Sequence, residues 1–227
     1  MSGGPLDTVL VVARAPVPGM AKTRLAATTG AEAAADLAAA ALLDTLAAAR
    51  SSGARVVVAM AGDLSRAARG EEVRAALQEV IVVGQRGVGL AERLANAHSD
   101  AHASAGGTPA ERPAVFQVGM DTPQLTAAML VEALAAARSY DAVLGEADDG
   151  GWWGLGVSHP DLAAALVGVA VSTPSTGRLT AAALRAAGVH VHALGRLRDV
   201  DEWPDAVAVA AQAPAGRFAA AVMALSF

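Results

Sequence analysis

Cysteine is absent from the 227-residue chain. Its absence excludes disulfides, a catalytic thiolate, a thiolate zinc site and an iron–sulfur cluster. Basic residues are not in excess either, because 17 Lys and Arg stand against 22 Asp and Glu, a formal net charge of -5. Proteins that bind nucleic acid nonspecifically gather basic residues on one face, so this balance argues against a nucleic-acid partner.

Long apolar runs are missing as well. The first residues include no basic region, and the apolar stretch 9–13 is too short for a signal or membrane-spanning segment. Elsewhere alanine, rather than runs of large apolar side chains, raises the hydrophobic content to 54%. We therefore expect a cytoplasmic protein with no membrane partner and one domain over residues 1–227. The oligomeric state stays open.

Short β-branched runs alternate with longer alanine-rich stretches, a pattern typical of strands that are connected through helices. Strands are predicted at 8–13, 55–60, 80–83, 114–118, 141–145, 152–157 and 189–194. Helices are predicted at 31–50, 64–77, 90–103, after Thr126, at 179–187 and at 203–212. Residues 104–112 (SAGGTPAER) are predicted to form a flexible loop. Together these elements predict a three-layer α/β/α fold with a mainly parallel, mixed sheet.

A cationic loop follows the first predicted strand, with the sequence RAPVPGMAKTRL over residues 14–25. Its candidate phosphate-binding residues are Arg14, Gly19, Lys22 and Arg24. A di- or triphosphate needs such charge neutralisation together with backbone donors at close approach. The loop is not a P-loop, which would require Gly where Pro16 and Ala21 stand, and G-x-G-x-x-G is absent. Spacing alone leaves open a surface loop with solvated cations.

Aspartates follow several predicted strands. They are Asp121 in GMDTP, Asp148 and Asp149 before a double glycine, and Asp199 and Asp201 near the last strand. In an open parallel sheet the ligand crevice lies at the carboxyl ends of the strands, where such residues can meet. Carboxylates are the ligands that Mg²⁺ and Mn²⁺ prefer. The alternative is that these aspartates only bond to nearby backbone amides in turns.

Histidine and serine motifs give weaker indications. His98 and His102 are four residues apart on a predicted helix, and His190 and His192 are two apart on a strand, so each pair shares a face. Without a third ligand nearby, exposed or hydrogen-bonded histidines are the better interpretation. The G-x-S-x-G elbow of Ser–His–Asp hydrolases is absent.

Five segments together resemble a known bacterial family. They read ARAPVPGMAKTRL, GMDTPQL, LGEADDGGWWGLGV, VSTPST and RDVDEWPD, in this order between about Val9 and Asp205. The chain resembles the DUF2064 proteins, also called radical-SAM/selenodomain-associated transferases. The resemblance implies a glycosyltransferase-A-like, nucleotide-diphospho-sugar transferase fold.

The resemblance also implies roles for individual residues. Lys22 and Arg24 would hold the nucleotide's phosphates, while Asp121 and Asp201 would bind Mg²⁺ or Mn²⁺. Two departures from the family pattern matter: Arg14 stands where Lys is common, and Glu202-Trp203-Pro204 stands where Thr-Pro is usual. The second departure leaves Asp199 open as the alternative second ligand.

The implied activity is metal-dependent transfer of a sugar from a nucleotide-diphospho-sugar to a small-molecule acceptor. Asp148 or Asp149 is the candidate base, because the following glycines let backbone approach a substrate. Of the adjacent Trp152 and Trp153, strand alternation would turn one ring toward the cleft, where it can stack on a sugar or base; core or surface positions for both are the alternative.

Two other functions remain open. The segment AKTRL also resembles phospholactate guanylyltransferases, which implies a nucleotidyltransferase that releases pyrophosphate. Against this stands the absence of the Gly-rich G-x-G-T-R loop of sugar nucleotidyltransferases. The third is a nucleotide-binding module that retains the fold without turnover.

Overall fold

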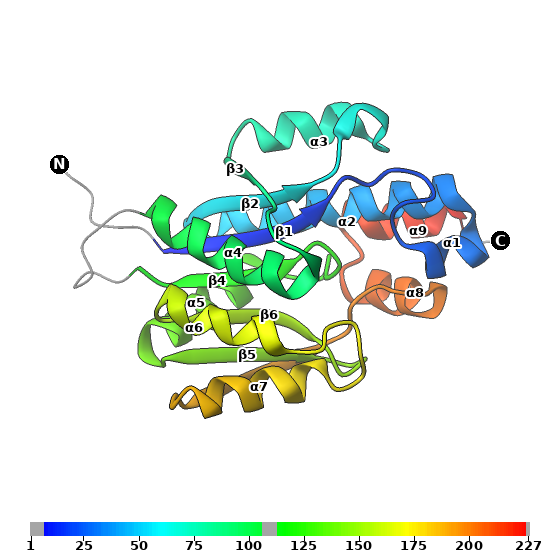
Figure 1. The fold of residues 1–227 in the computed structure, drawn as a ribbon. Helices are drawn as coiled ribbons and strands as arrows, with labels where there is room; N and C mark the ends of the chain where they lie inside the picture. Colours follow the sequence, from blue (N-terminus) through cyan, green and yellow to red (C-terminus); the bar gives the residue numbers. More distant parts are fainter. Residues whose placement is uncertain (1–6, 106–112, 226–227) are drawn as a thin grey trace.

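The computed structural model describes residues 7–105 and 113–225, and its centre is a seven-stranded sheet (Figure 1). The strands are β1 (Thr8–Arg14), β2 (Arg55–Ala61), β3 (Ile81–Gly84), β4 (Val115–Gly119), β5 (Ala142–Ala147), β6 (Trp152–Val157) and β7 (Val191–Leu197). Their order is β3-β2-β1-β4-β6-β5-β7. Only β6 runs antiparallel to its neighbours, β4 and β5. The prediction of a mainly parallel, mixed sheet is confirmed.

Helices cover both faces of this sheet and complete three layers (Figure 1). One face carries α2 (Ala31–Ser51), α3 (Gly70–Leu77) and α5 (Ala127–Ser139). The other carries α4 (Gly89–Ala105), α6 (Pro160–Ala163) and α7 (Thr176–Ala186). Short 3₁₀ helices, η1 (Leu64–Arg66) and η2 (Ala164–Gly168), precede α3 and follow α6.

Three further helices extend the layer on the α2 side. They are α1 (Thr23–Thr29), α8 (Trp203–Gln212) and α9 (Arg217–Leu225), and they pack with α2 around a second apolar cluster. Leu25, Leu37, Val209 and Phe218 are buried in it. This cluster anchors the segments that precede α1 and α8, and both of these segments contribute to the site.

Burial on both faces explains why the central strands are readable in the sequence. In β1, Val9 and Val11 pack toward α2 and α5, whereas Leu10 packs toward α4. All three are fully buried. A strand covered on both faces is a continuous β-branched run rather than an alternating one.

Several predicted boundaries differ from the structure. The predicted helix 64–77 is two segments, because Arg69 adopts a left-handed conformation (φ 49°) between η1 and α3. The predicted loop 104–112 begins too early, since Ser104 and Ala105 complete α4; residues 106–112 lie outside the described residues. β7 begins and ends later than predicted, and α7 begins earlier.

Within the described part of the chain, no helix has the length and apolar character needed to cross a membrane.

The order of the strands has a direct consequence for the position of a site. From β1 the chain proceeds outward to β2 and β3 and then returns to β4, on the other side of β1. The carboxyl ends of β1 and β4 therefore form a switch point, where connections diverge and leave a crevice.

Candidate active site

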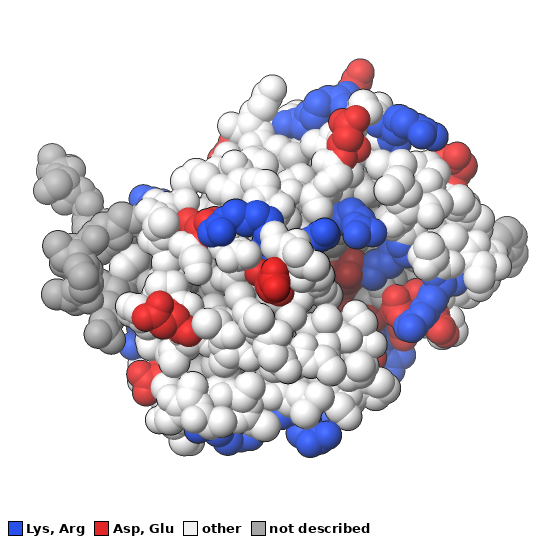
Figure 2. All heavy atoms as spheres, in the orientation of Figure 1, with Lys and Arg blue, Asp and Glu red and all other residues white. Residues whose placement is uncertain are grey.

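A cleft of about 980 Å³ opens at this switch point. Loops after β1 and β4, the β5–β6 turn, residues 172–174 and the loop after β7 all contribute to its wall. In Figure 2, acidic and basic side chains gather in and around a hollow on the right of the face shown. The charged residues that line the cleft are Arg14, Lys22, Arg24, Arg93, Asp121, Asp149, Asp199 and Asp201. The sequence-predicted constellation is largely brought together here.

The loop after β1 places the cations. Its Gly19 adopts a left-handed turn conformation (φ 75°) but does not line the cleft, whereas Arg14 does. Arg14 donates through Nη1 to the carbonyl of Met20 at 3.3 Å. Lys22 also has a left-handed backbone (φ 51°), caps α1, and turns its ammonium into the cleft.

Both cations at the start of α1 are ion-paired with acids of the cleft wall. Lys22 Nζ lies 3.0 Å from Asp121 Oδ1 and also donates to the carbonyl of Val200. Arg24 pairs with Asp201, which raises the pKa of the Arg24 guanidinium; Asp149 contributes more weakly. The residues predicted to hold phosphate are thus paired with the residues predicted to hold metal.

Backbone contacts hold the loops after β4 and β7 against each other. Val200 N–H donates to the carbonyl of Asp121 at 2.9 Å. Met120, just before Asp121, accepts from Arg14 N–H through its sulfur at 3.3 Å. Asp121 is therefore fixed between the first and last loops of the site, as the strand-end interpretation predicts.

Among the acids of the cleft, Asp199 has a clearly shifted pKa. Burial, followed by the nearby charge of Asp149 and a smaller contribution from Asp121, raises its pKa to about 6. Backbone hydrogen bonding and Lys22 act in the opposite direction but do not offset the burial. Perturbed carboxylates of this kind are typical of functional sites. Asp199 and Asp201 both line the cleft, so the choice of second metal ligand between them stays open.

The β5–β6 turn separates the two candidate bases. Asp149 lines the cleft, and its Oδ1 accepts from Gly151 N–H at 2.7 Å. Asp148 instead lies 3.7 Å from Arg196 Nε and 3.5 Å from Arg198 Nε, and does not line the cleft. Asp149 is thus the better-placed candidate base.

Close packing fixes this turn. Gly150 has a φ of 87°, and a Cβ atom there would lie 2.0 Å from the carbonyl oxygen of Pro174. Gly177 N–H, at the start of α7, donates to the Gly150 carbonyl at 2.8 Å. The turn bearing Asp149 is therefore attached to the segment 172–174 that forms one wall of the cleft.

The tryptophans are placed differently from the stacking prediction. Trp153 is 5% exposed, packs edge-on against Phe116 and donates through Nε1 to Gly195 O at 2.9 Å. Trp152 is half-buried and packs on the cluster that α4 and α7 share. Neither lines the cleft, because the strand turns one ring to each covered face of the sheet rather than to its edge. Of the two alternatives, the structure favours the one in which neither ring faces the cleft.

Sequence reasoning missed several residues of the cleft wall, including Gln85, Arg93, Ser172 and Thr173. The Gln85 amide donates to the carbonyls of Ala13 and Ala59 at 2.8 and 2.9 Å and joins the ends of β1 and β2. Only its place in a glycine-punctuated loop, 84–89, could have drawn attention to it.

The buried histidines do not belong to the cleft. His98 is fully buried in α4, and no described protein group pairs with either ring nitrogen. Its ring stacks on His102 with centroids 6.4 Å apart. The preferred interpretation of an exposed or hydrogen-bonded histidine was therefore wrong for His98.

The donor set of the cleft fits a hard divalent cation. All candidate ligands are carboxylate oxygens, which hard divalent cations prefer. Burial first, and the like charge of Asp149 second, raise the pKa of Asp199, and a bound cation would stabilise its ionised form. Over residues 7–105 and 113–225, no three acidic or histidine side chains converge closely enough to form a metal cage by themselves. Mg²⁺ is commonly held by one or two carboxylates together with substrate phosphates.

Comparison with known proteins identifies the family and the fold. The family described as "Uncharacterized protein conserved in bacteria (DUF2064)" matches residues 42–173, more than half of the chain. A search of curated proteins found no match.

Among solved structures, a Desulfovibrio desulfuricans G20 protein provisionally assigned as a nucleotide-diphospho-sugar transferase superposes with a TM-score of 0.77. It is 24% identical, over 97% of this chain and 98% of that one. The manganese complex of Rv0371c from Mycobacterium tuberculosis H37Rv gives 0.54 at 21% identity, over 91% and 98%. A nucleotidyl transferase from Methanothermobacter thermautotrophicus gives 0.56 at 18% identity, over 91% and 96%. These likenesses confirm the glycosyltransferase-A-like fold.

Proposed function

The chain belongs to the DUF2064 family of bacterial proteins, and from the residues of its cleft we propose that it is a metal-dependent transferase. Its donor is a nucleotide-diphospho-sugar, and its acceptor is a small molecule. One observation carries the proposal: Lys22 and Arg24 pair with Asp121 and Asp201 at the switch point of the sheet. Cations for a diphosphate and carboxylates for a divalent metal meet in one cleft, which is what donor binding requires.

Each side chain has a chemical task in this proposal. Lys22 and Arg24 bind the diphosphate and stabilise the charge that develops on the leaving nucleoside diphosphate. Asp121, with Asp201 or Asp199, holds Mg²⁺ or Mn²⁺, which when bound supplies further charge neutralisation to that leaving group. Arg14, at the start of the same loop, also binds the phosphates.

Asp149 accepts the proton of the attacking hydroxyl. It is exposed, lines the cleft and is held by Gly151 N–H, so its carboxylate is oriented before the acceptor arrives. Arg196 and Arg198 neutralise Asp148, which therefore serves to hold the turn. The manganese complex of the similar Rv0371c structure supports the choice of a divalent cation.

A nucleotidyltransferase is the second candidate, favoured by the likeness to the Methanothermobacter thermautotrophicus nucleotidyl transferase. The same cations and acids would then hold a nucleoside triphosphate, and the leaving group would be pyrophosphate. The two activities differ in their released product, so product analysis separates them.

The test is incubation with panels of nucleotide-sugars and of nucleoside triphosphates, each with Mg²⁺ or Mn²⁺ and candidate hydroxyl acceptors. Release of a nucleoside diphosphate, lost in Asp149→Asn, supports the glycosyl transfer. Release of pyrophosphate establishes the second candidate instead. Metal-dependent binding with no turnover in any mixture, and with unchanged affinity in Asp149→Asn, would identify a non-catalytic nucleotide-binding module.

A further inference from the structure

Two ion pairs connect different segments of the cleft wall. The cations, Lys22 and Arg24, come from the loop and helix after β1, whereas the acids, Asp121 and Asp201, follow β4 and β7. Each pair joins one residue proposed to bind phosphate with one proposed to bind metal. A metal ion therefore competes with the two cations for the acids, and a phosphate competes with the two acids for the cations.

The Lys22 pair is the more buried of the two. The Lys22 side chain is 14% exposed and Asp121 is 39% exposed, against 69% for Arg24 and 37% for Asp201. When one partner of a partly desolvated pair is taken away, the other is left as an uncompensated charge, which is costly. A metal ion alone on Asp121 would leave the Lys22 ammonium unpaired. A phosphate alone on Lys22 would leave Asp121 unpaired beside an anion.

We infer that the cleft binds a divalent cation and a polyphosphate as one unit, by an exchange of partners. Lys22 and Arg24 leave Asp121 and Asp201 for the phosphate oxygens, and the cation takes the two carboxylates. The exchange replaces every separated pair with a new pair of opposite charges, so no charge is left uncompensated. Free cation and free polyphosphate therefore each bind weakly, and each strengthens the other reciprocally.

This inference rests on the proposed function, and its test uses ligands that carry no base or sugar. Binding of Mn²⁺ alone is measured from the electron paramagnetic resonance signal of free Mn²⁺, on wild type and on Lys22→Met. We expect Lys22→Met to bind Mn²⁺ alone about fivefold to tenfold more tightly, because Asp121 is released from its partner. Inorganic pyrophosphate without metal should bind this variant more weakly, measured by calorimetry. Tighter Mn²⁺ binding together with weaker pyrophosphate binding distinguishes an exchange from general loosening of the loops.

Matched variants complete the test. Arg24→Met should tighten Mn²⁺ binding by a smaller factor, since its pair is more exposed. Arg138→Met breaks the pair with Asp7 outside the cleft and should leave Mn²⁺ affinity unchanged. Unchanged or weaker Mn²⁺ binding in a folded Lys22→Met protein would overturn the exchange, and Arg24→Met decides the point if Lys22→Met does not fold. Wild type that fails to bind the preformed Mn²⁺–pyrophosphate complex would overturn the proposed function as well.

Discussion

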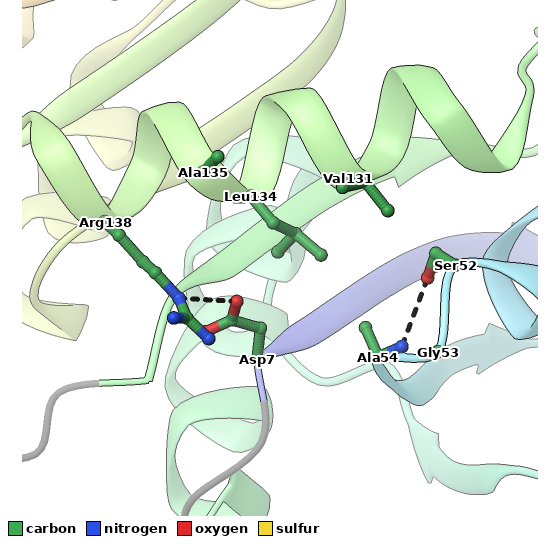
Figure 3. Close-up of a pocket in the computed structure, with 8 residues that line it drawn as sticks. All are labelled: Asp7, Ser52, Gly53, Ala54, Val131, Leu134, Ala135 and Arg138. Atoms are coloured by element: carbon green, nitrogen blue, oxygen red, sulfur yellow. Dashed lines mark hydrogen bonds and ion pairs between the residues drawn. The ribbon is translucent and has the colours of Figure 1, made fainter.

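The amino-terminal ends of the parallel strands lie along one side of the sheet, the amino edge, and their carboxyl-terminal ends along the other, the carboxyl edge. Both carry an ion-paired aspartate, in different surroundings. At the amino edge, a pocket of about 340 Å³ is lined by residues that include Asp7, Ala54, Leu134 and Arg138 (Figure 3). Arg138 Nε donates to Asp7 Oδ2 at 2.7 Å, and Ala114 N–H donates to Asp7 Oδ1 at 3.1 Å. Both oxygens of this carboxylate are occupied by groups of the protein, so Asp7 connects β1, β4 and α5 structurally.

At the carboxyl edge, four acids and four cations line one cleft. Burial first, and the like charge of Asp149 second, raise the pKa of Asp199, so its ionised form is destabilised there. The comparison shows that an ion pair alone does not indicate function. The distinguishing features are several loops that converge at a switch point and charges that remain available to a ligand.

The largest expected effect concerns the base. Asp149→Asn keeps the size of the side chain and its oxygen acceptor but removes proton transfer, and we expect kcat to fall by about 10²–10⁴-fold. The matched variant is Asp148→Asn in the same turn, which should lower kcat by less than about tenfold. Steady-state rates of product release measure both. Equal losses in the two variants would contradict the assignment of Asp149.

The next effect separates the two edges directly. Asp121→Asn should weaken Mn²⁺-dependent nucleotide binding by about 100-fold, because a charged metal ligand and the partner of Lys22 are both lost. Asp7→Asn, the corresponding substitution at the amino edge, should leave this binding unchanged. Calorimetric titration of a Mn²⁺–nucleotide complex compares them. Similar affinities for Asp121→Asn and wild type would place the metal elsewhere.

A third prediction concerns the core rather than either edge. Burial first, and the neighbouring His102 second, lower the pKa of His98 to about 3. The unfolded chain, with an ordinary histidine pKa, takes up a proton that the folded protein does not. The stability that neutral His98 supplies is therefore fully present above pH 6.5 and is lost as the pH falls toward 3, by about 2 kcal/mol at pH 5.

Urea unfolding at pH 7 and pH 5 measures this effect as a difference between wild type and His98→Leu. The titration of distant groups, including Asp199 with its opposite shift, cancels in that difference. We expect the variant to lose less stability on acidification than wild type does. Parallel losses in the two proteins would show that His98 does not set the acid sensitivity.

The smallest expected effect tests the placement of Trp153. Trp153→Phe removes the hydrogen bond to Gly195 and some buried ring, and should lower the free energy of unfolding by about 1–2 kcal/mol. Nucleotide affinity should stay at the wild-type value, because the ring lies in the core. A loss of affinity without a loss of stability would restore the stacking role.

The sequence predicted the fold well where burial leaves a direct trace. Strands such as β1 are covered on both faces, and their β-branched runs mark them. α1 left no such trace, because it is seven residues long and its cap is the left-handed backbone of Lys22 rather than a Ser, Thr or Asp side chain. α9, which has a buried face against α2, was also not predicted.

The site was predictable only as far as strand ends determine it. Asp121 could be placed because proline ends its strand and the crevice rule applies there. Asp148 and Asp149 could not be separated, since adjacent residues in a tight turn point differently and only the structure places Arg196 and Arg198 beside Asp148. The alternation of side chains along a strand predicted that the two tryptophans point in different directions. It did not predict that helices cover both faces of the sheet at their position.

The most direct measurement is a crystal structure of wild type with Mn²⁺ and a nucleoside diphosphate, with the metal located by its anomalous scattering. We expect a manganese peak beside Asp121 and Asp201, the two acids that the exchange releases. We also expect phosphate oxygens on Lys22 and Arg24, both released from the acids with which they pair in the structure described here. A nucleotide bound outside the cleft, or a manganese ion away from Asp121 with the Lys22–Asp121 pair intact, would contradict this expectation.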